Sequence, residues 1–357
     1  MNTKQLVRIL SDRIEHGDYD VDGFPAERQL AEELYTSRMT LRKAIDALIE
    51  DGIVARLPNG RISIDHGSSQ REKRGQVALI AHTMEPGNDN QLFFEWNQTI
   101  QARIDSENGV VRTELVRHFN EPVLHTLLAR MDGVFLLPGD QTVDTDTQAI
   151  IAESERLVVL DQDWSYLGIP SIVRFPARFL RGLWDHLYEN GHRRILLFNT
   201  QPESPQIRSY LEEWNLWCRM HRVHGSLINE PVQEFGHIIR DSHRLMTERV
   251  QSGALRETAI CTTTNNAAIG VVRALYSCGM TVGEDVSVCT VHAPLAKYSV
   301  PTVTSLQNAQ LDPFIRACFD WFMSGGNVEQ WSSSLLMEPA EFRLFVGEST
   351  GPVSQSQ

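Results

Sequence analysis

The chain has 357 residues, of which 41% are hydrophobic and 22% are charged. This length allows two or three domains with cores of their own, and the composition is that of an ordinary globular protein. The sequence contains no run of 18 apolar residues, and charged side chains occur throughout residues 1–16. We therefore expect a cytoplasmic protein with neither a membrane-spanning helix nor a signal peptide.

The formal net charge is −13, which excludes a uniformly basic nucleic-acid binder. Residues 1–75 hold twelve Lys and Arg and thirteen Asp and Glu, so their net charge is only −1 and the rest belongs to residues 76–357. A near-neutral head with one basic helix is compatible with DNA binding, and repulsion from the acidic remainder would sharpen its salt dependence.

The five cysteines are odd in number, widely spaced and contain no C-x-x-C pair. We expect reduced thiols, most of them small core residues, rather than disulfides or a zinc site. The sequence predicts neither a metal site nor a cofactor.

Residues 1–66 predict a winged helix-turn-helix domain of the α+β class. A helix over 3–16 and a loop over 17–23 precede two further segments with apolar residues at helical spacing, separated by a turn at Tyr35-Thr36. Ser37 is a natural N-cap for the second of these helices. Residues 53–56 and 61–64 then alternate like two strands, joined by a segment whose Asn-Gly pair is typical of a hairpin.

Positive charge gathers at the start of the second of these helices, where Arg38, Arg42 and Lys43 occur without an acid among them. Arginine at the exposed start of a helix can enter the major groove and read guanine O6 and N7. Arg28 is placed to hold a phosphate, and Gly60 beside Arg61 lets the hairpin approach a minor groove or phosphates. A merely solvated helix face would explain any one of these arginines, but explains the whole arrangement poorly.

Residues 3–64 resemble the DNA-binding domain of the GntR family of bacterial transcription regulators. The matching segments are Ile14 to Gly17, Phe24 to Ala31, Ser37 to Ala44 and Leu48 to Val54. The resemblance implies DNA contacts at Arg28, Arg38, Thr40 and Arg42 and a wing tip at Gly60. With the charges and the cap, the candidate DNA-binding residues are Arg28, Ser37, Arg38, Thr40, Arg42, Lys43, Gly60 and Arg61.

Two positions depart from that family. Ala26 stands where the family usually has Ser, so a helix cap worth roughly 1 kcal/mol is missing. The wing tip also lacks a second Gly near Pro58-Asn59, which makes insertion of the wing into a minor groove less certain.

Residues 67–75 are small and polar, without periodicity, and are predicted to be a linker. From residue 76 to 346, short β-rich runs alternate with amphipathic helices, which predicts an α/β domain with parallel sheets covered on both faces. The expected strands are Val77–His82, Val110–His118, Gly133–Pro138, Leu157–Asp161, Ile172–Phe175, Arg194–Asn199, Thr258–Thr263 and Val286–Val291. The segment exceeds one doubly wound lobe, so we expect two lobes and a cleft at the carboxyl ends of the strands. Residues 347–357 are predicted to be a flexible tail.

Residues 77–345 resemble the sugar-binding domain of the lactose and galactose repressor family, which is related to periplasmic binding proteins. The best matches are Met131–Pro138, Gly191–Ile195, Gly283–Val288 and Pro301–Leu306. A GntR-type head on such a body resembles the arabinose-repressor subgroup. The resemblance implies a two-lobed domain that binds a small carbohydrate-like effector, and a homodimer on double-stranded operator DNA, with no membrane.

The implied effector positions depart from that family in part. Thr264-Asn265 replaces its usual polar pair, His292 stands in place of an acid, and Arg174 and Phe175 replace an Asn/Asp pair, whereas Asp161 is kept. The candidate effector-binding residues are His82, Thr83, Asp161, Arg174, Arg208, Thr264, Asn265 and His292. Because acids are exchanged for neutral or basic groups, we expect an effector with a carboxylate or phosphate, such as a sugar acid or sugar phosphate.

Two alternatives stay open. A regulator of the same fold could sense a partner protein, in which case a degenerate cleft is expected. Some GntR-headed proteins carry a body like a pyridoxal-phosphate aminotransferase, which needs a Schiff-base lysine. After Lys73 the only lysine is Lys297, and no Walker, G-x-S-x-G or H-E-x-x-H motif occurs. The sequence therefore predicts a transcription regulator, most simply a repressor, and not an enzyme.

Overall fold

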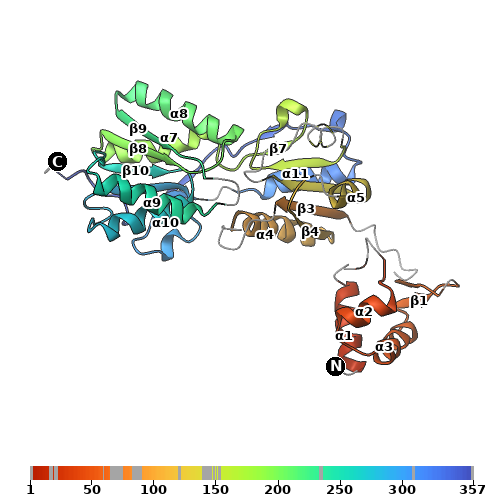
Figure 1. Ribbon diagram of the computed structural model, residues 1–357. Helices are drawn as coiled ribbons and strands as arrows, with labels where there is room; N and C mark the ends of the chain where they lie inside the picture. The colour runs from red at the N-terminus through yellow and green to blue at the C-terminus, as the bar shows by residue number, and fades with distance from the viewer. Residues whose placement is uncertain are drawn as a thin grey trace. The chain divides into compact units, whose positions relative to one another are not determined.

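The computed structural model describes residues 3–15, 19, 23–58, 60–64, 75–82, 91–119, 122–138, 147, 149, 151, 154–232, 236–307 and 310–354. The chain forms two compact units, a head whose last strand ends at Ile64 and a body whose first strand begins at Gln76 (Figure 1). Of the predicted linker, residues 67–74 lie outside the described residues. No helix in the described ranges is both long enough and apolar enough to cross a membrane.

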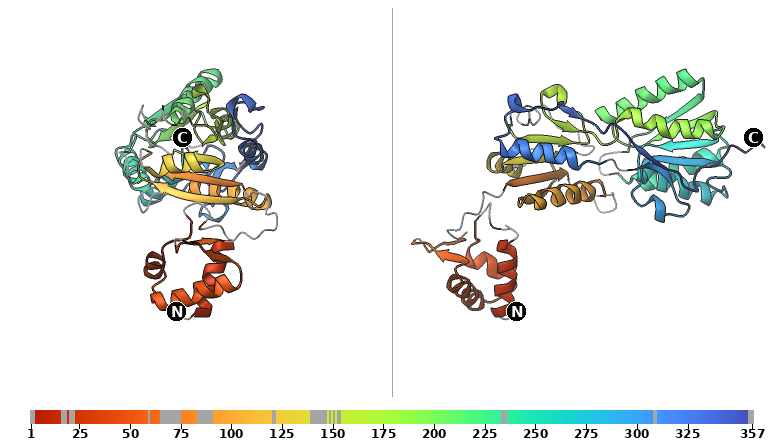
Figure 2. Two further views of the ribbon diagram at one scale, coloured as in Figure 1. Left: turned by 90° about the vertical axis from the view of Figure 1, so that its right-hand side faces the viewer. Right: turned by 180° about the vertical axis from the view of Figure 1, so that it is seen from behind.

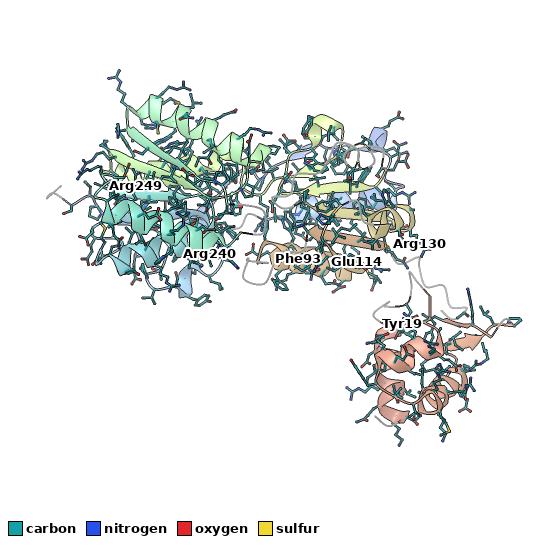
Figure 3. All side chains as sticks on the ribbon, in the orientation of Figure 1. Tyr19, Phe93, Glu114, Arg130, Arg240 and Arg249 are labelled. Atoms are coloured by element: carbon teal, nitrogen blue, oxygen red, sulfur yellow. The ribbon has the colours of Figure 1, made fainter. Side chains whose placement is uncertain are left out.

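The head contains α1 (Thr3–Glu15), α2 (Glu27–Glu33) and α3 (Arg38–Glu50), followed by β1 (Val54–Arg56) and β2 (Ile62–Ile64). The two strands form an antiparallel hairpin in which Arg56 is opposite Ile62. Apolar residues at helical spacing meet in one core, whose fully buried members are Leu6, Leu10, Leu30, Leu41, Ala44, Ile45 and Leu48. Beside this core the hydroxyl of Tyr19, labelled in Figure 3, accepts a hydrogen bond of 3.3 Å from Arg13. This arrangement confirms the predicted winged helix-turn-helix.

The first lobe of the body is built on a six-stranded sheet with the order β13-β7-β6-β5-β3-β4. Its strands are β3 (Gln76–His82), β4 (Val110–Val116), β5 (Gly133–Leu137), β6 (Leu157–Leu160), β7 (Ser171–Ile172) and β13 (Leu336–Met337). Its helices are α4 (Gln91–Ser106), α5 (Pro122–Arg130) and α11 (Asp312–Met323). β5 is buried along its whole length, as expected for a central parallel strand. A Cβ at Gly133 would overlap the ring of Phe322, so this glycine lets α11 pack directly on the sheet.

The second lobe has a six-stranded sheet with the order β14-β12-β11-β10-β8-β9. Its strands are β8 (Arg194–Asn199), β9 (His224–Asn229), β10 (Ala259–Thr262), β11 (Ser287–His292), β12 (Thr304–Gln307) and β14 (Arg343–Phe345). Its helices are α7 (Ala177–Glu189), α8 (Pro205–His221), α9 (Ile238–Gln251) and α10 (Asn265–Ser277). All its strand pairs are parallel except that of β12 with β14.

Successive residues of β8 point to opposite faces of this sheet. Ile195 and Leu197 join the core under α7 and α8, whereas Leu196 and Phe198 join the core under α9 and α10. The two helix layers on either side of the sheet can be followed in Figures 1 and 2. The mainly parallel sheets, with helices on both faces of the sheet in the second lobe, confirm the predicted α/β fold.

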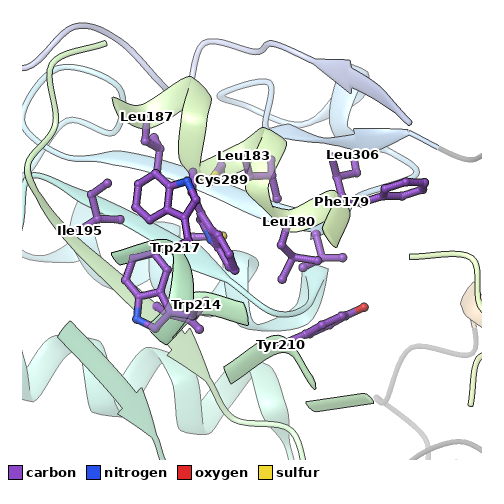
Figure 4. Close-up of a cluster of buried hydrophobic side chains, with 14 of the residues drawn as sticks. Phe179, Leu180, Leu183, Leu187, Ile195, Tyr210, Trp214, Trp217, Cys289 and Leu306 are labelled. Carbon is purple, nitrogen blue, oxygen red and sulfur yellow. The ribbon is translucent and has the colours of Figure 1, made fainter. Parts of the chain in front are cut away.

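The core under α7 and α8 contains a group of three tryptophans (Figure 4). The ring centroids of Trp184 and Trp214 are 5.0 Å apart, and those of Trp214 and Trp217 are 5.7 Å apart. Phe175 and Tyr210 belong to the same buried cluster. The hydroxyl of Tyr210 donates to the Phe175 carbonyl at 2.8 Å. This hydrogen bond fixes the segment that leads from one lobe to the other.

The chain crosses between the lobes three times, between β7 and α7, between β12 and α11, and between β13 and β14. The strand predicted at Ile172–Phe175 ends at Ile172, so Arg174 and Phe175 belong to the first of these crossings. Strands β9, β12, β13 and β14 were not predicted from the sequence.

The carboxyl-terminal segment corrects one expectation. Residues 347–357 were predicted to be a flexible tail, but Ser349 is fully buried in the second lobe. Its backbone pairs with Thr302 and Val288, and Val353 donates to the Asn190 carbonyl at 2.9 Å. The backbone groups of Ser349 bond to β11 and to the segment just before β12, so the chain is tied to the second lobe at this point. Residues 355–357 lie outside the described part of the chain.

Candidate functional site

α3 presents a polar face to solvent. The side chain of Ser37 accepts a hydrogen bond of 3.1 Å from the Thr40 backbone N–H, which confirms it as the N-cap. Ala26 provides no side-chain cap for α2, as its replacement of Ser predicted. The exposed residues of α3 are Arg38, Met39, Arg42, Lys43, Asp46 and Glu50.

Two of the candidate DNA contacts are paired with carboxylates of α2. Arg42 Nη2 lies 2.9 Å from Glu27 Oε2, and Arg28 Nε lies 3.2 Å from Glu32 Oε1. Partial burial would raise the pKa of Glu27, but hydrogen bonds from Arg42 and Arg56 outweigh it and lower that pKa. Glu27 therefore stays ionised and holds Arg42 in position. No described residue forms an ion pair with Arg38.

The remaining head candidates lie on α3 and on the hairpin. Lys43 is exposed on α3. Gly60 has a φ of +79°, and nothing lies within 4 Å of the position that its Cβ would take. The hairpin closes through a hydrogen bond of 2.8 Å from the Leu57 N–H to the Arg61 carbonyl. The eight candidates therefore lie on α2, on α3 and its N-cap, and on the hairpin.

The body contains a cavity of about 230 Å³ that is lined by both lobes. The first lobe supplies the carboxyl ends of β5 and β6, and the second supplies the first turns of α8 and α10 and the end of β11. Its polar lining residues include Asp161, Gln162, Arg174, Gln201, Ser204, Gln206, Tyr210, Thr263, Thr264, Asn265, Asn266 and His292. The cavity lies where the sequence predicted a ligand, at the carboxyl ends of parallel strands.

Arg174 is the buried cation of this cavity, with a side chain only 2% exposed. Its Nε lies 3.1 Å from Asp161 Oδ2, and its Nη1 lies 2.9 Å from Glu95 Oε2. The guanidinium also lies over the ring of Trp96, 5.0 Å from its centroid. Trp96 in turn donates to Asp161 Oδ2 at 2.5 Å. Arg174 is therefore neutralised by two carboxylates of the protein itself.

Glu95 joins the two lobes. It projects from α4 of the first lobe, and its Oε2 lies 3.0 Å from Nε2 of His292 at the end of β11 in the second. Burial would raise the pKa of Glu95, but the hydrogen bond and charge of His292 and the charge of Arg174 outweigh it and hold that pKa below its usual range. We refer to Glu95, Asp161, Arg174 and His292 as the cleft network.

Five of the predicted effector residues line the cavity, namely Asp161, Arg174, Thr264, Asn265 and His292. Thr264 is the N-cap of α10, and Gln201 donates to its hydroxyl at 3.3 Å. Asn265 follows it in the first turn.

Two predicted effector residues do not line the cavity. His82 Nε2 lies 2.8 Å from the Arg117 carbonyl, because the end of β3 directs this side chain toward the segment after β4. Arg208 pairs with Glu203 at 2.9 Å and is half exposed, because it lies on the opposite side of α8 from the lining residue Tyr210. Thr83 lies outside the described residues.

Sequence reasoning missed Glu95, Gln162, Gln201, Gln206 and Tyr210. Glu95 lies within a predicted helix, and nothing in its spacing connects it with His292, 197 residues later. Gln201 follows the end of β8, so the rule that ligands bind at the carboxyl ends of strands could have found it. Lys297, the residue on which the aminotransferase alternative depends, lies in η2 (Ala296–Tyr298), with its Nζ 5.6 Å from the Phe345 ring centroid. It is not among the described residues that line the cavity.

Sequence models of two families match the chain. Residues 2–64 match the gntR family of bacterial regulatory proteins, and residues 184–312 match a periplasmic binding protein-like domain. Neither description is that of an enzyme. A comparison with curated protein sequences found no significant match.

Solved structures resemble the chain over most of its length. The lac repressor dimer bound to operator and the anti-inducer ONPF has a TM-score of 0.62 at 17% identity, covering 79% of this chain and 96% of that chain. A LacI family regulator from Enterococcus faecium with bound ribose has a TM-score of 0.59 at 16% identity, covering 78% and 100%. A LacI family regulator from Arthrobacter sp. FB24 in complex with lactose has a TM-score of 0.60 at 18% identity, covering 78% and 99%.

At these identities the likeness to solved structures establishes the fold alone. The class of protein follows from the head, which matches the gntR family of bacterial regulatory proteins. The chain is therefore a transcription regulator in which a DNA-binding domain of the gntR family precedes a periplasmic binding protein-like domain of the LacI-family fold.

Proposed function

We propose that this protein is a dimeric repressor whose affinity for operator DNA is set by a small carbohydrate-like molecule bound between the lobes of the body. One observation carries the proposal: the same chain contains a cavity between the two lobes of the body and a helix of the head, α3, with exposed basic side chains. Similar folds in the lac repressor dimer bound to operator, and in regulators with ribose and lactose, support it.

The arrangement of the body suggests how the two activities are coupled. Closure of the lobes around an effector would bend the three crossings and displace the paired heads relative to each other. Effector and operator would then alter each other's affinity by the same factor, because the coupling is a single free energy. The direction of that change decides whether the effector releases or recruits DNA.

DNA binding is tested by selecting duplexes from a random library with the full-length protein at low salt. We expect two inverted half-sites whose centres are a whole number of helical turns apart, as required for a symmetric dimer. Failure to enrich any sequence would refute the proposal. A single unpaired half-site would refute the dimer.

The size of the cavity favours a single sugar ring or a polyol. Its volume of about 230 Å³ lies just below the range of ~300–1,000 Å³ that is usual for small-molecule sites. Phe175 and Tyr210 offer apolar surface, while Gln201, Asn265 and Asp161 offer hydrogen-bonding groups. This combination suits a ring with hydroxyl groups on its edge.

The contacts of Arg174 and His292 bear on the charge expected of the effector. The sequence predicted a sugar acid or sugar phosphate because Arg174 and His292 replace acids. In the structure both side chains contact carboxylates of the cleft network, so they offer an anion little uncompensated positive charge. We therefore propose a neutral, hydroxyl-rich effector.

A thermal-shift screen of matched ligands tests this choice, for example glucose, gluconate and glucose 6-phosphate, with the corresponding galactose and ribose sets. A true ligand at a hundredfold excess over its Kd stabilises the folded protein by about 2.7 kcal/mol. Tighter binding of the acid or phosphate in each set would overturn the neutral effector. A regulator that senses only a partner protein would respond to none of these compounds.

A further inference from the structure

Among its described residues, the head exposes three large hydrophobic side chains, Tyr35, Met39 and Leu57. They lie on the turn before α3, on the first turn of α3, and beside the tip of the hairpin. Exposed apolar groups that gather on one functional surface usually mark a place of contact. Of the three, only Met39 belongs to α3 itself, and its exposed fraction is 72%.

Met39 occupies the centre of the solvent face of α3. A helix turns by about 100° per residue, which puts Met39 roughly opposite Leu48, a fully buried residue of the head core. Arg38 precedes Met39 directly, and Arg42 and Lys43 follow one turn later. The apolar side chain is therefore surrounded by the cations that would contact DNA.

Two neighbours of Met39 on the helix, Thr40 and Arg42, already have partners. The Ser37 hydroxyl caps α3 and lies 2.7 Å from the Thr40 hydroxyl, and Arg42 is held by Glu27. No described residue forms a hydrogen bond with the side chain of Met39, and its thioether is at most a weak hydrogen-bond acceptor. It can gain free energy in the major groove only by apolar contact, and the C5-methyl group of thymine is the apolar group exposed there.

We propose that Met39 is a specificity-determining residue that recognises a thymine methyl group in each operator half-site. The inference rests on the proposed DNA binding, and it assigns the recognition of one base in each half-site to Met39. Recognition helices contact base edges with the residues of their first turns, which is where Met39 lies.

The test uses the full-length protein and the operator that it selects. Each thymine of the half-site is replaced in turn by deoxyuridine, in both half-sites together, which removes only the methyl group. For the wild-type protein we expect one thymine whose replacement weakens binding about fourfold per half-site, the equivalent of roughly 0.8 kcal/mol for one buried methyl, and therefore about sixteenfold for the two half-sites together.

The Met39→Ala variant should bind the thymine operator more weakly and should no longer distinguish thymine from deoxyuridine at that position. Met39→Leu, which keeps an apolar side chain of similar volume, should largely restore the difference. The control is Met220→Ala, which changes an exposed methionine on α8 of the body and should keep the full wild-type difference between the two operators.

Two outcomes would overturn the inference while leaving DNA binding intact. In one, no thymine shows the methyl effect. In the other, the effect persists undiminished in Met39→Ala. If the protein selects no operator at all, the proposed function fails first and this inference fails with it.

Discussion

Ala26 is the residue where the head departs most simply from a well-capped helix. Its backbone angles, φ −59° and ψ 138°, are compatible with an N-cap, but its methyl group cannot accept hydrogen bonds from the free N–H groups of α2. Ala26→Ser should therefore raise the free energy of unfolding of the head by about 1 kcal/mol. Urea unfolding of the full chain, followed by a probe in the head, measures this change. The same substitution at Ala102, an exposed residue inside α4, should bring no such gain.

Replacing the arginines of the head should have two kinds of effect on DNA binding, a change in base preference or a uniform loss of affinity. Arg38→Ala should cost roughly 1–3 kcal/mol of operator binding and relax base preference at one position, because no described carboxylate competes for this side chain. Arg28→Ala should weaken binding to all sequences alike, since a phosphate carries no base information. Selection of binding sites with each variant distinguishes the two.

A matched control for these variants is Arg244→Ala, which removes an exposed arginine paired with Glu248 on α9 of the body, much as Arg28 is paired with Glu32 on α2. It should leave operator affinity unchanged. Equal base preferences in Arg38→Ala and the wild type would contradict the assignment of Arg38 as a base contact.

Glu95 should make the stability of the body depend on pH. Its pKa is lowered in the folded state, so its contribution is complete above the usual carboxyl pKa of about 4.3 and is lost as the pH falls through the lowered value. Glu95→Gln should therefore reduce the free energy of unfolding by roughly 1–3 kcal/mol at pH 7. The difference from the wild type should shrink as the pH falls below 4.

Urea titrations at several pH values measure the effect of Glu95→Gln. Glu212→Gln, at an exposed position of α8, serves as the control and should change little at any pH. A penalty for Glu95→Gln that stays constant from pH 7 to pH 3.5 would show that its carboxylate charge is not responsible.

At the scale of elements, the carboxyl-terminal segment acts as part of the second lobe. The Ser349 hydroxyl donates to the Val288 carbonyl at 2.6 Å and accepts from the Thr304 N–H at 2.9 Å, and the residue is fully buried. Ser349→Ala would leave both backbone groups without this partner, which should destabilise the lobe by roughly 1–3 kcal/mol. Urea unfolding measures the loss, and Ser354→Ala, at an exposed position, should show none. An equal stability of the two variants would contradict this role.

The head could be predicted almost completely from the sequence because its determinants are local. Helical spacing, the Ser37 cap and the hairpin turn each act over a few residues, so the chain order alone brings them together. The same held for the central strands of the body, whose continuous apolar runs are visible in the sequence. Edge strands such as β9 and β14 lack such runs, because their residues are exposed or only partly buried.

The cleft could be predicted only in part, since it is assembled from distant segments. Asp161, Thr264 and His292 were found because the resemblance to the lactose and galactose repressor family implies effector contacts at these positions. Glu95 was missed because only the folded body brings α4 to the end of β11. The charge predicted for the effector was based on Arg174 alone, since the sequence does not show the two carboxylates that pair with it in the folded body.

At the scale of the whole molecule, a single strand links the end of the chain to the cavity. β11 pairs with Ser349 near its beginning through Val288 and carries His292 at its last position. A fluorophore attached at residue 354 would therefore travel with the second lobe as one piece instead of trailing on a loose tether. Paired with a second dye on α5 of the first lobe, it would turn lobe movement into an optical signal, and the regulator into a sensor of its own effector.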